Sequence, residues 1–218
     1  MFVDSDDALE DGAVEALMRE YSKGGCEFVT ATYRTMSEDG RSMRPKPVRA
    51  RSHGAPWGRV YGREVWRDVC FPEGLWFEDT VQAYCVGPRF ASRYLDVGVY
   101  RYRRRASSVT ATCSASKRGA DAYWVVEAMI GWCRRLGIEL GQALYDQTVR
   151  QFGALALNRT AALDEAELRA FFACCCGLLE DVGEFRDLCT TMRGAWRDID
   201  RSLRTQDFGL WKLACSAL

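Results

Sequence analysis

The chain opens with Met1-Phe2-Val3-Asp4-Ser5-Asp6-Asp7, a short apolar run that ends in acidic residues. The apolar start predicts the last residues of a buried strand. Carboxylates that follow such a strand lie where open α/β sheets bind ligands. Asp4 and Asp6 therefore form a candidate site for Mg²⁺ or Mn²⁺, which prefer oxygen ligands. The alternative is a helix N-cap with an acidic first turn before Ala8.

Helical and strand patterns alternate over the next hundred residues. Apolar residues at helical spacing predict a helix over 8–21, and β-branched and aromatic residues predict a strand over 26–33. Further expected elements are a loop at 37–51, a short helix at 59–67, a turn at 71–74, a helix at 78–86 and a strand at 93–103. We expect residues 1–114 to form one α/β layer.

The second half has a helical pattern throughout. Four helices are expected, at 121–136, 140–157, 164–182 and 184–203. Asp164 followed by Glu167 is typical of a capping box. We therefore expect residues 115–218 to form an all-helical C-terminal domain.

Composition limits the function classes. The chain has 218 residues, is 48% hydrophobic and contains 30 basic and 30 acidic residues, which predicts a packed core and no nucleic-acid partner. The ten cysteines include no C-x-x-C pair, which favours reduced thiols. The acidic start and the shortness of the longest apolar run, 170–179, argue against a secretory signal and a membrane span. We expect a cytoplasmic protein. The single histidine, His53, excludes an H-E-x-x-H zinc site, which needs two histidines.

Three further clusters carry candidate chemistry. Glu78 and Asp79 follow bulky apolar residues and could supply a general base in a dry pocket, or could simply cap a helix. The arginines ending at Arg105, followed by hydroxyl residues, suit phosphate oxygens, and the alternative is a charged edge strand. Trp57 lies in a Pro/Gly-flanked turn and could stack on a sugar or pack in the core.

The order of these clusters resembles the family 2 glycosyltransferases of the GT-A fold, in particular bacterial enzymes of capsule, exopolysaccharide and cell-wall glycan synthesis. The matching stretches are Phe2 to Asp7, Trp57-Gly58-Arg59-Val60-Tyr61, Phe71-Pro72-Glu73-Gly74, Glu78-Asp79 and Tyr102 to Thr110. The resemblance covers about residues 1–112 and implies a partial GT-A layer, Rossmann-like in its alternation. Arg59 departs from the family's usual lysine but keeps the charge.

The resemblance implies roles on the donor side. Asp4 and Asp6 match the D-x-D acids that contact the sugar nucleotide and its Mn²⁺ or Mg²⁺ ion. Arg105 matches an arginine that faces the diphosphate leaving group. The implied donor is a nucleotide sugar, most often a UDP-sugar.

On the acceptor side, the resemblance implies that Asp79 is the base that deprotonates the acceptor hydroxyl. Glu78 supports it, and Trp57 lines the acceptor side. The acceptor would be a glycan or a lipid-linked sugar, which fits an enzyme at the inner face of the membrane. Peripheral membrane association and an oligomeric state are both compatible with this interpretation.

The resemblance also implies a segment that this sequence does not contain. Family members start with an S-V-I-V-P-like strand and further β-α units, on the order of 80–90 residues, that bind the nucleotide base. We expect the 218-residue chain by itself to have little or no transferase activity.

Two alternatives remain open. The chain could be a catalytically inactive interaction module that acts through its helical half. It could also be a haloacid-dehalogenase-like phosphatase with Asp4 as nucleophile and Asp6 as acid/base. Against the phosphatase, Asp7-Ala8 replace the Gly-Thr pair of that family, and none of the lysines has a suitable context.

Overall fold

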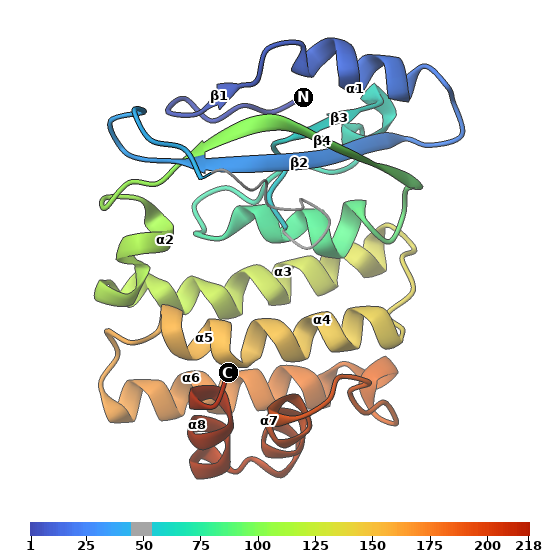
Figure 1. Cartoon of the computed structure of the whole chain (residues 1–218). Coiled ribbons are helices and arrows are strands. Elements are labelled where there is room, and N and C mark those ends of the chain that lie inside the picture. The colour runs from blue at the N-terminus through green and yellow to red at the C-terminus, as the bar shows by residue number, and fades with distance from the viewer. Residues whose placement is uncertain (45–53) are drawn as a thin grey trace. The chain divides into compact units, whose positions relative to one another are not determined.

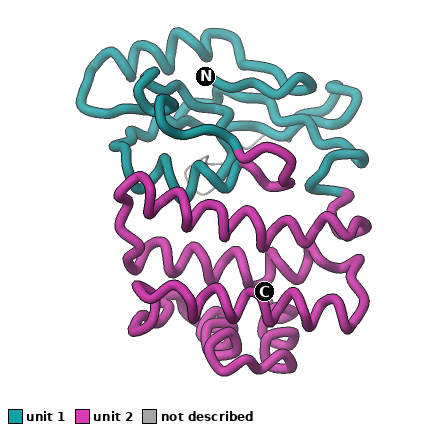
Figure 2. Tube along the Cα trace, turned by 180° about the vertical axis from the view of Figure 1, so that it is seen from behind, with its two compact units in different colours: residues 1–71, 79–111 teal, residues 72–78, 112–218 magenta. Residues whose placement is uncertain are grey.

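The computed structural model describes residues 1–44 and 54–218, which divide into two compact units (Figure 2). Unit 1 comprises Met1–Phe71 and Asp79–Ala111, and unit 2 comprises Pro72–Glu78 and Thr112–Leu218. Unit 2 thus includes one short segment, Pro72–Glu78, from the first half of the sequence. That the first stretch is the acceptor-side half of a transferase stays a prediction.

Unit 1 is built on a four-stranded mixed sheet with the strand order β1-β4-β2-β3 (Figure 1). The strands are β1 (Ala8–Leu9), β2 (Phe28–Met36), β3 (Arg59–Tyr61) and β4 (Ser92–Arg103). The two long strands, β2 and β4, are parallel to each other, whereas β1 and β3 pair antiparallel at the edges. The α/β class and the strands expected at 26–33 and 93–103 are confirmed. Because β2 and β4 are parallel, their carboxyl ends lie at the same edge of the sheet.

The core of unit 1 is formed between helix α1 (Ala13–Tyr21) and the sheet. Ala13 and Leu17, one helical turn apart, are both buried against Val29 of β2 and Val99 of β4. The same apolar positions that predict the helix are therefore the ones that hold it on the sheet.

The expectation for the first residues is wrong. Residues 1–7 form no strand, and β1 begins only at Ala8, after the acidic segment. Phe2 instead packs edge-on against the aromatic rings of Tyr61, Trp66 and Phe71, at centroid distances of 5.9, 4.9 and 5.2 Å. The apolar run thus serves side-chain packing rather than strand pairing. The helix expected from residue 8 begins at Ala13, so the acidic residues do not cap it either.

Other elements of unit 1 differ in detail. The short helix expected at 59–67 is divided into β3 and a 3₁₀ turn, η2 (Arg63–Trp66), because Arg59–Tyr61 pairs with β2. The helix expected at 78–86 is present as a 3₁₀ turn, η3 (Glu78–Thr80), and a π-helical stretch, η4 (Gln82–Val86). Within the loop expected at 37–51, residues 37–44 turn back on β2, and residues 45–53, including His53, lie outside the described residues.

Unit 2 is helical, as expected. Its main helices are α3 (Asp121–Arg135), α4 (Gln142–Phe152), α5 (Ala154–Arg159), α6 (Glu165–Asp181), α7 (Ala195–Thr205) and α8 (Phe208–Ser216) (Figure 1). A short helix, α2 (Val109–Thr112), and two 3₁₀ turns, η5 (Cys113–Ala115) and η6 (Lys117–Ala120), precede them. In the described residues, no helix has the length and apolar character needed to cross a membrane.

The helix boundaries of unit 2 follow local signals in some places only. The Asp164 carboxylate accepts a hydrogen bond from the Glu167 N–H at 2.9 Å, and the Asp164 N–H donates one to the Glu167 carboxylate at 3.0 Å. The capping box is therefore confirmed. The helix expected at 140–157 is broken at Gly153, where a Cβ atom would lie 3.0 Å from the Trp196 ring. The helix expected at 184–203 is wrong: helical structure there consists of a 3₁₀ turn, η7 (Gly183–Phe185), and α7. Helix α8 was not expected.

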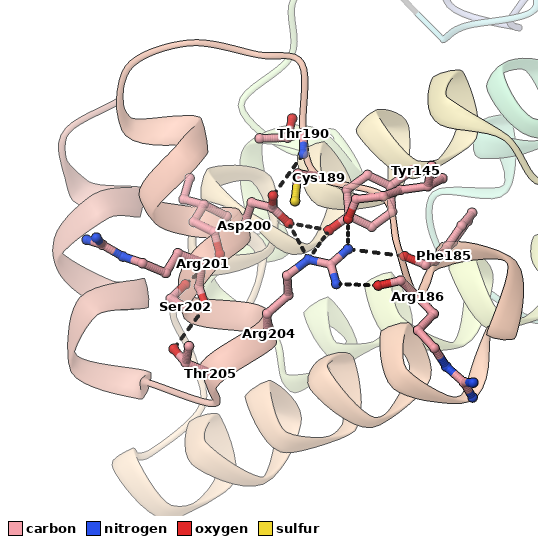
Figure 3. A network of polar contacts seen from close by, with 12 residues as sticks. Tyr145, Phe185, Arg186, Cys189, Thr190, Asp200, Arg201, Ser202, Arg204 and Thr205 are labelled. Carbon is pink, nitrogen blue, oxygen red and sulfur yellow. Dashed lines mark hydrogen bonds and ion pairs between the residues drawn. The ribbon is translucent and has the colours of Figure 1, made fainter.

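The chain between η7 and α7, where a helix was expected, is held by a polar network around the buried Asp200 (Figure 3). Asp200 of α7, only 5% exposed, accepts hydrogen bonds from the Tyr145 hydroxyl and, at 2.8 Å, from the Thr190 backbone. The Arg204 guanidinium lies 3.4 Å from Asp200 and donates to the carbonyls of Phe185 and Arg186 at 3.1 Å. Side chains therefore form hydrogen bonds with backbone N–H and carbonyl groups here, in place of the hydrogen bonds that a helix would supply.

Candidate functional site

The acidic segment of unit 1 is attached to the carboxyl end of β4. The backbone N–H of Arg103 donates to the Asp7 carboxylate at 2.7 Å, and the Arg103 side chain donates to the Asp6 carbonyl at 2.6 Å. The Asp4 N–H donates to the Tyr100 hydroxyl at 3.0 Å. Residues almost a hundred positions apart thus meet at the edge where β2 and β4 both end.

Two of the expected site residues lie together there. The Arg105 guanidinium forms an ion pair with the Asp6 carboxylate at 3.1 Å. Both side chains are partly exposed, 45% for Arg105 and 25% for Asp6. An exposed pair of this kind adds little to stability, since solvent screens it. Its guanidinium can therefore be shared with an incoming anion at small cost, and it offers the planar fork that suits phosphate oxygens.

Asp7 was not among the expected site residues, yet its carboxylate is the one that anchors the acidic segment to β4. Burial raises the pKa of the Asp7 carboxyl, and the hydrogen bond from the Arg103 backbone offsets part of this rise. Burial also raises the pKa of the nearby Tyr100 hydroxyl, whose oxygen holds Asp4. Asp7 and Arg103 fix the position of the segment, so that Asp6 reaches Arg105. No local signal in the sequence distinguishes Asp7 from its acidic neighbours.

Trp57 is a core residue in this structure. It is 8% exposed, and its ring stacks on Tyr100 at 4.6 Å and on Tyr102 at 5.2 Å, with interplanar angles of 9° and 14°. The edge of Tyr33 packs against the ring at 4.8 Å. The core-packing alternative thus accounts for its position, and stacking on a sugar would require the ring to become uncovered.

Glu78 and Asp79 lie in η3, in the first turns of the helical stretch that continues to Val86. Glu78 is exposed and belongs to unit 2, whereas Asp79 is half-buried and belongs to unit 1. The Asp6–Arg105 ion pair does not include them. Their place at a helix start fits the capping alternative as well as the general-base prediction.

The residue before this pair has an unusual backbone. Phe77 has φ of 65°, in the left-handed region that non-glycine residues rarely adopt. Within unit 2 its ring lies under the Arg159 guanidinium, 3.8 Å from the centroid, and the Trp76 N–H donates to Asp121 at 2.9 Å. Such contacts are needed to hold a strained residue in place, and strained residues are concentrated at functional sites.

The donor set for a divalent ion is incomplete. Residues 1–44 and 54–218 contain no group of three or more metal-ligating side chains, and Asp6 is already paired with Arg105. Asp4 and Asp6 could supply two oxygen ligands, and a diphosphate and water would have to supply the rest. The phosphatase alternative loses support, since the described structure places no strand before Asp4.

Comparison with known proteins adds no assignment to this geometry. No family model matches the sequence, and a search of curated proteins found no match.

Proposed function

We propose that this chain is the acceptor-side half of an inverting glycosyltransferase that uses a nucleotide-sugar donor. The observation that supports this most directly is the ion pair between Asp6 and Arg105, 3.1 Å apart. These residues come from two motifs that the family resemblance independently assigns to the diphosphate. Their meeting at the carboxyl edge of a parallel strand pair is also the usual ligand position of α/β sheets.

The proposed reaction transfers a sugar to a hydroxyl group of a glycan or lipid-linked acceptor. Asp79 takes the proton of the acceptor hydroxyl, whose oxygen attacks the anomeric carbon as the bond to the diphosphate breaks. Glu78 supports the base, and Arg105 binds the diphosphate as it leaves. A Mn²⁺ or Mg²⁺ ion, held by Asp4 and Asp6 when bound, would neutralise part of the diphosphate charge.

The same proposal covers the setting of the reaction. The donor is a UDP-sugar, and the product belongs to capsule, exopolysaccharide or cell-wall glycan synthesis at the cytoplasmic face of the membrane. The helical segment Thr112–Leu218 is proposed to be an appended region with no part in the chemistry.

Removing the Arg105 guanidinium should weaken UDP binding. We expect Arg105→Met to raise the dissociation constant of UDP about tenfold, because a charged hydrogen bond to phosphate is lost. Isothermal titration calorimetry with the purified chain measures this. Arg19→Met is the matched control, since it removes an exposed arginine of α1 in the same unit and should leave the affinity unchanged. An unchanged affinity in Arg105→Met would remove the main support for the donor site.

Metal binding should depend on the nucleotide. We expect Mn²⁺ to bind weakly to the chain alone and at least about tenfold more tightly with UDP, since two carboxylates leave most of the coordination shell to other ligands. Asp6→Ala should abolish the gain from UDP. Titration of Mn²⁺ with and without UDP tests this, and equal Mn²⁺ affinity in the wild type and in Asp6→Ala would exclude a metal role for Asp6.

A further inference from the structure

A hollow lies beside the carboxyl ends of β2 and β4 and is separate from the Asp6–Arg105 pair. After β2 ends at Met36, the chain turns back so that Met43 pairs with Met36, and the Arg44 N–H donates to the Thr35 carbonyl at 2.9 Å. The Arg104 N–H donates to the Met36 carbonyl at 3.0 Å, which brings the residue after β4 to the same place. The hollow has a volume of about 310 Å³. We call it the hairpin hollow; it is lined by Thr35, Met36, Ser37, Ser42, Met43, Arg44 and Arg104.

The hairpin hollow carries positive charge that no described residue neutralises. Among the described residues, Arg44 and Arg104 are the charged ones that line it, and neither guanidinium forms an ion pair or hydrogen bond with the rest of the described chain. The neighbouring arginines differ in this respect. Arg103 donates to two backbone carbonyls, and Arg105 is paired with Asp6.

The polar lining also has unused capacity for hydrogen bonds. The Thr35 hydroxyl oxygen is buried and has no hydrogen-bond partner in the described structure. A buried hydroxyl without a partner is costly, and a ligand oxygen would relieve that cost. A carboxylate of the same hairpin, Asp39, is engaged by the Ser37 hydroxyl at 2.6 Å and by the Arg41 N–H at 3.0 Å, and these two bonds hold its pKa below the usual value.

We propose that the hairpin hollow binds a phosphate or diphosphate group of a ligand. Arg44 and Arg104 supply two guanidinium forks that suit phosphate oxygens, and the Thr35 hydroxyl supplies a further donor. Met36 and Met43 form an adaptable apolar wall next to the charges. The site goes beyond the proposed function, because it uses residues that the transfer reaction does not.

Pyrophosphate is the probe that tests the site, titrated by calorimetry into the full chain. All proteins carry Arg105→Met, so that the proposed donor site does not contribute. We expect the double variant Arg44→Met/Arg104→Met to raise the dissociation constant about tenfold or more. Replacing both arginines with lysine should restore part of the affinity, because lysine keeps the charge but not the fork. The control is Arg41→Met, which removes an exposed arginine of the same hairpin outside the lining and should change nothing.

Two further ligands distinguish the source of the phosphate. Farnesyl diphosphate binding at least about tenfold more tightly than pyrophosphate, with the difference lost in Met43→Ser, would assign a lipid-linked ligand. Equal affinities for UDP, pyrophosphate and farnesyl diphosphate would assign a free phosphate group. The proposal is overturned if pyrophosphate binds equally well to the double variant, if Arg41→Met weakens binding as much, or if no binding is measurable. Thermal unfolding of each variant checks that it is folded.

Discussion

Replacing Asp200 with alanine is expected to lower the free energy of unfolding by about 1–3 kcal/mol, the usual cost of leaving a buried hydrogen-bonding group without its partner. Asp200 is 5% exposed and accepts hydrogen bonds from the Tyr145 hydroxyl and the Thr190 backbone, beside the Arg204 guanidinium (Figure 3). The variant would leave the buried Tyr145 hydroxyl and the partly buried Thr190 N–H without their acceptor. Burial and the Asp200 carboxylate raise the pKa of Tyr145, so its hydroxyl is protonated at neutral pH and needs an acceptor.

Helix α7 also provides the matched control. Asp198 lies two residues earlier and pairs with Arg201 at 2.8 Å, but both side chains are about half exposed. Asp198→Ala should therefore cost at most about 1 kcal/mol. Urea unfolding followed by circular dichroism compares the two variants. Similar losses for Asp198→Ala and Asp200→Ala would mean that the network contributes nothing beyond a surface ion pair.

Replacing Asp79 with asparagine is expected to lower the turnover number of sugar transfer about 10²–10⁴-fold, the usual contribution of a general base. Asparagine keeps the size of the side chain and its hydrogen-bonding oxygen but cannot take a proton at neutral pH. The dissociation constant of UDP should stay unchanged, since Asp79 is proposed to act on the acceptor. This split between turnover and donor binding separates a base from a residue that merely supports the fold.

The assay for Asp79 uses the chain joined to the nucleotide-binding β-α units of a similar glycosyltransferase, because the resemblance implies that they position the donor. Asp96→Asn, which changes an exposed acid of β4, is the control and should keep full turnover. Full activity in Asp79→Asn would show that another residue is the base, with Glu78 the next to replace. Loss of UDP binding together with turnover would instead indicate a structural role for Asp79.

Elements that depend on neighbours in the sequence could be predicted well. The β-branched and aromatic runs of β2 and β4 and the apolar spacing of α1 and α6 carry their own signals. The capping box of Asp164 and Glu167 is likewise a contact between residues three positions apart. Local periodicity and capping therefore predicted the mixed α/β class and the helical second half.

The acidic segment and the arginines after β4 could be identified as candidates from the sequence, but their contacts could not. The pairing of Asp6 with Arg105, and of Asp7 with the Arg103 backbone, depends on how the parallel strands β2 and β4 end at one edge. Phe2 is of a residue type that is common in strands, yet its ring packs against Trp66 and Phe71. Such choices depend on partners far away along the chain.

The sequence by itself determined the elements with a strong local pattern, β2, β4, α1 and α6, and which residues could carry chemistry, since those properties follow from propensity, spacing and side-chain type. Only the tertiary structure decided that Asp6 meets Arg105, that Arg44 and Arg104 line one hollow with no ion-pair partner in the described part of the chain, and that Tyr145 and Asp200 are buried together. The physical reason is that burial and pairing depend on contacts between residues distant in sequence, for which local patterns carry no information.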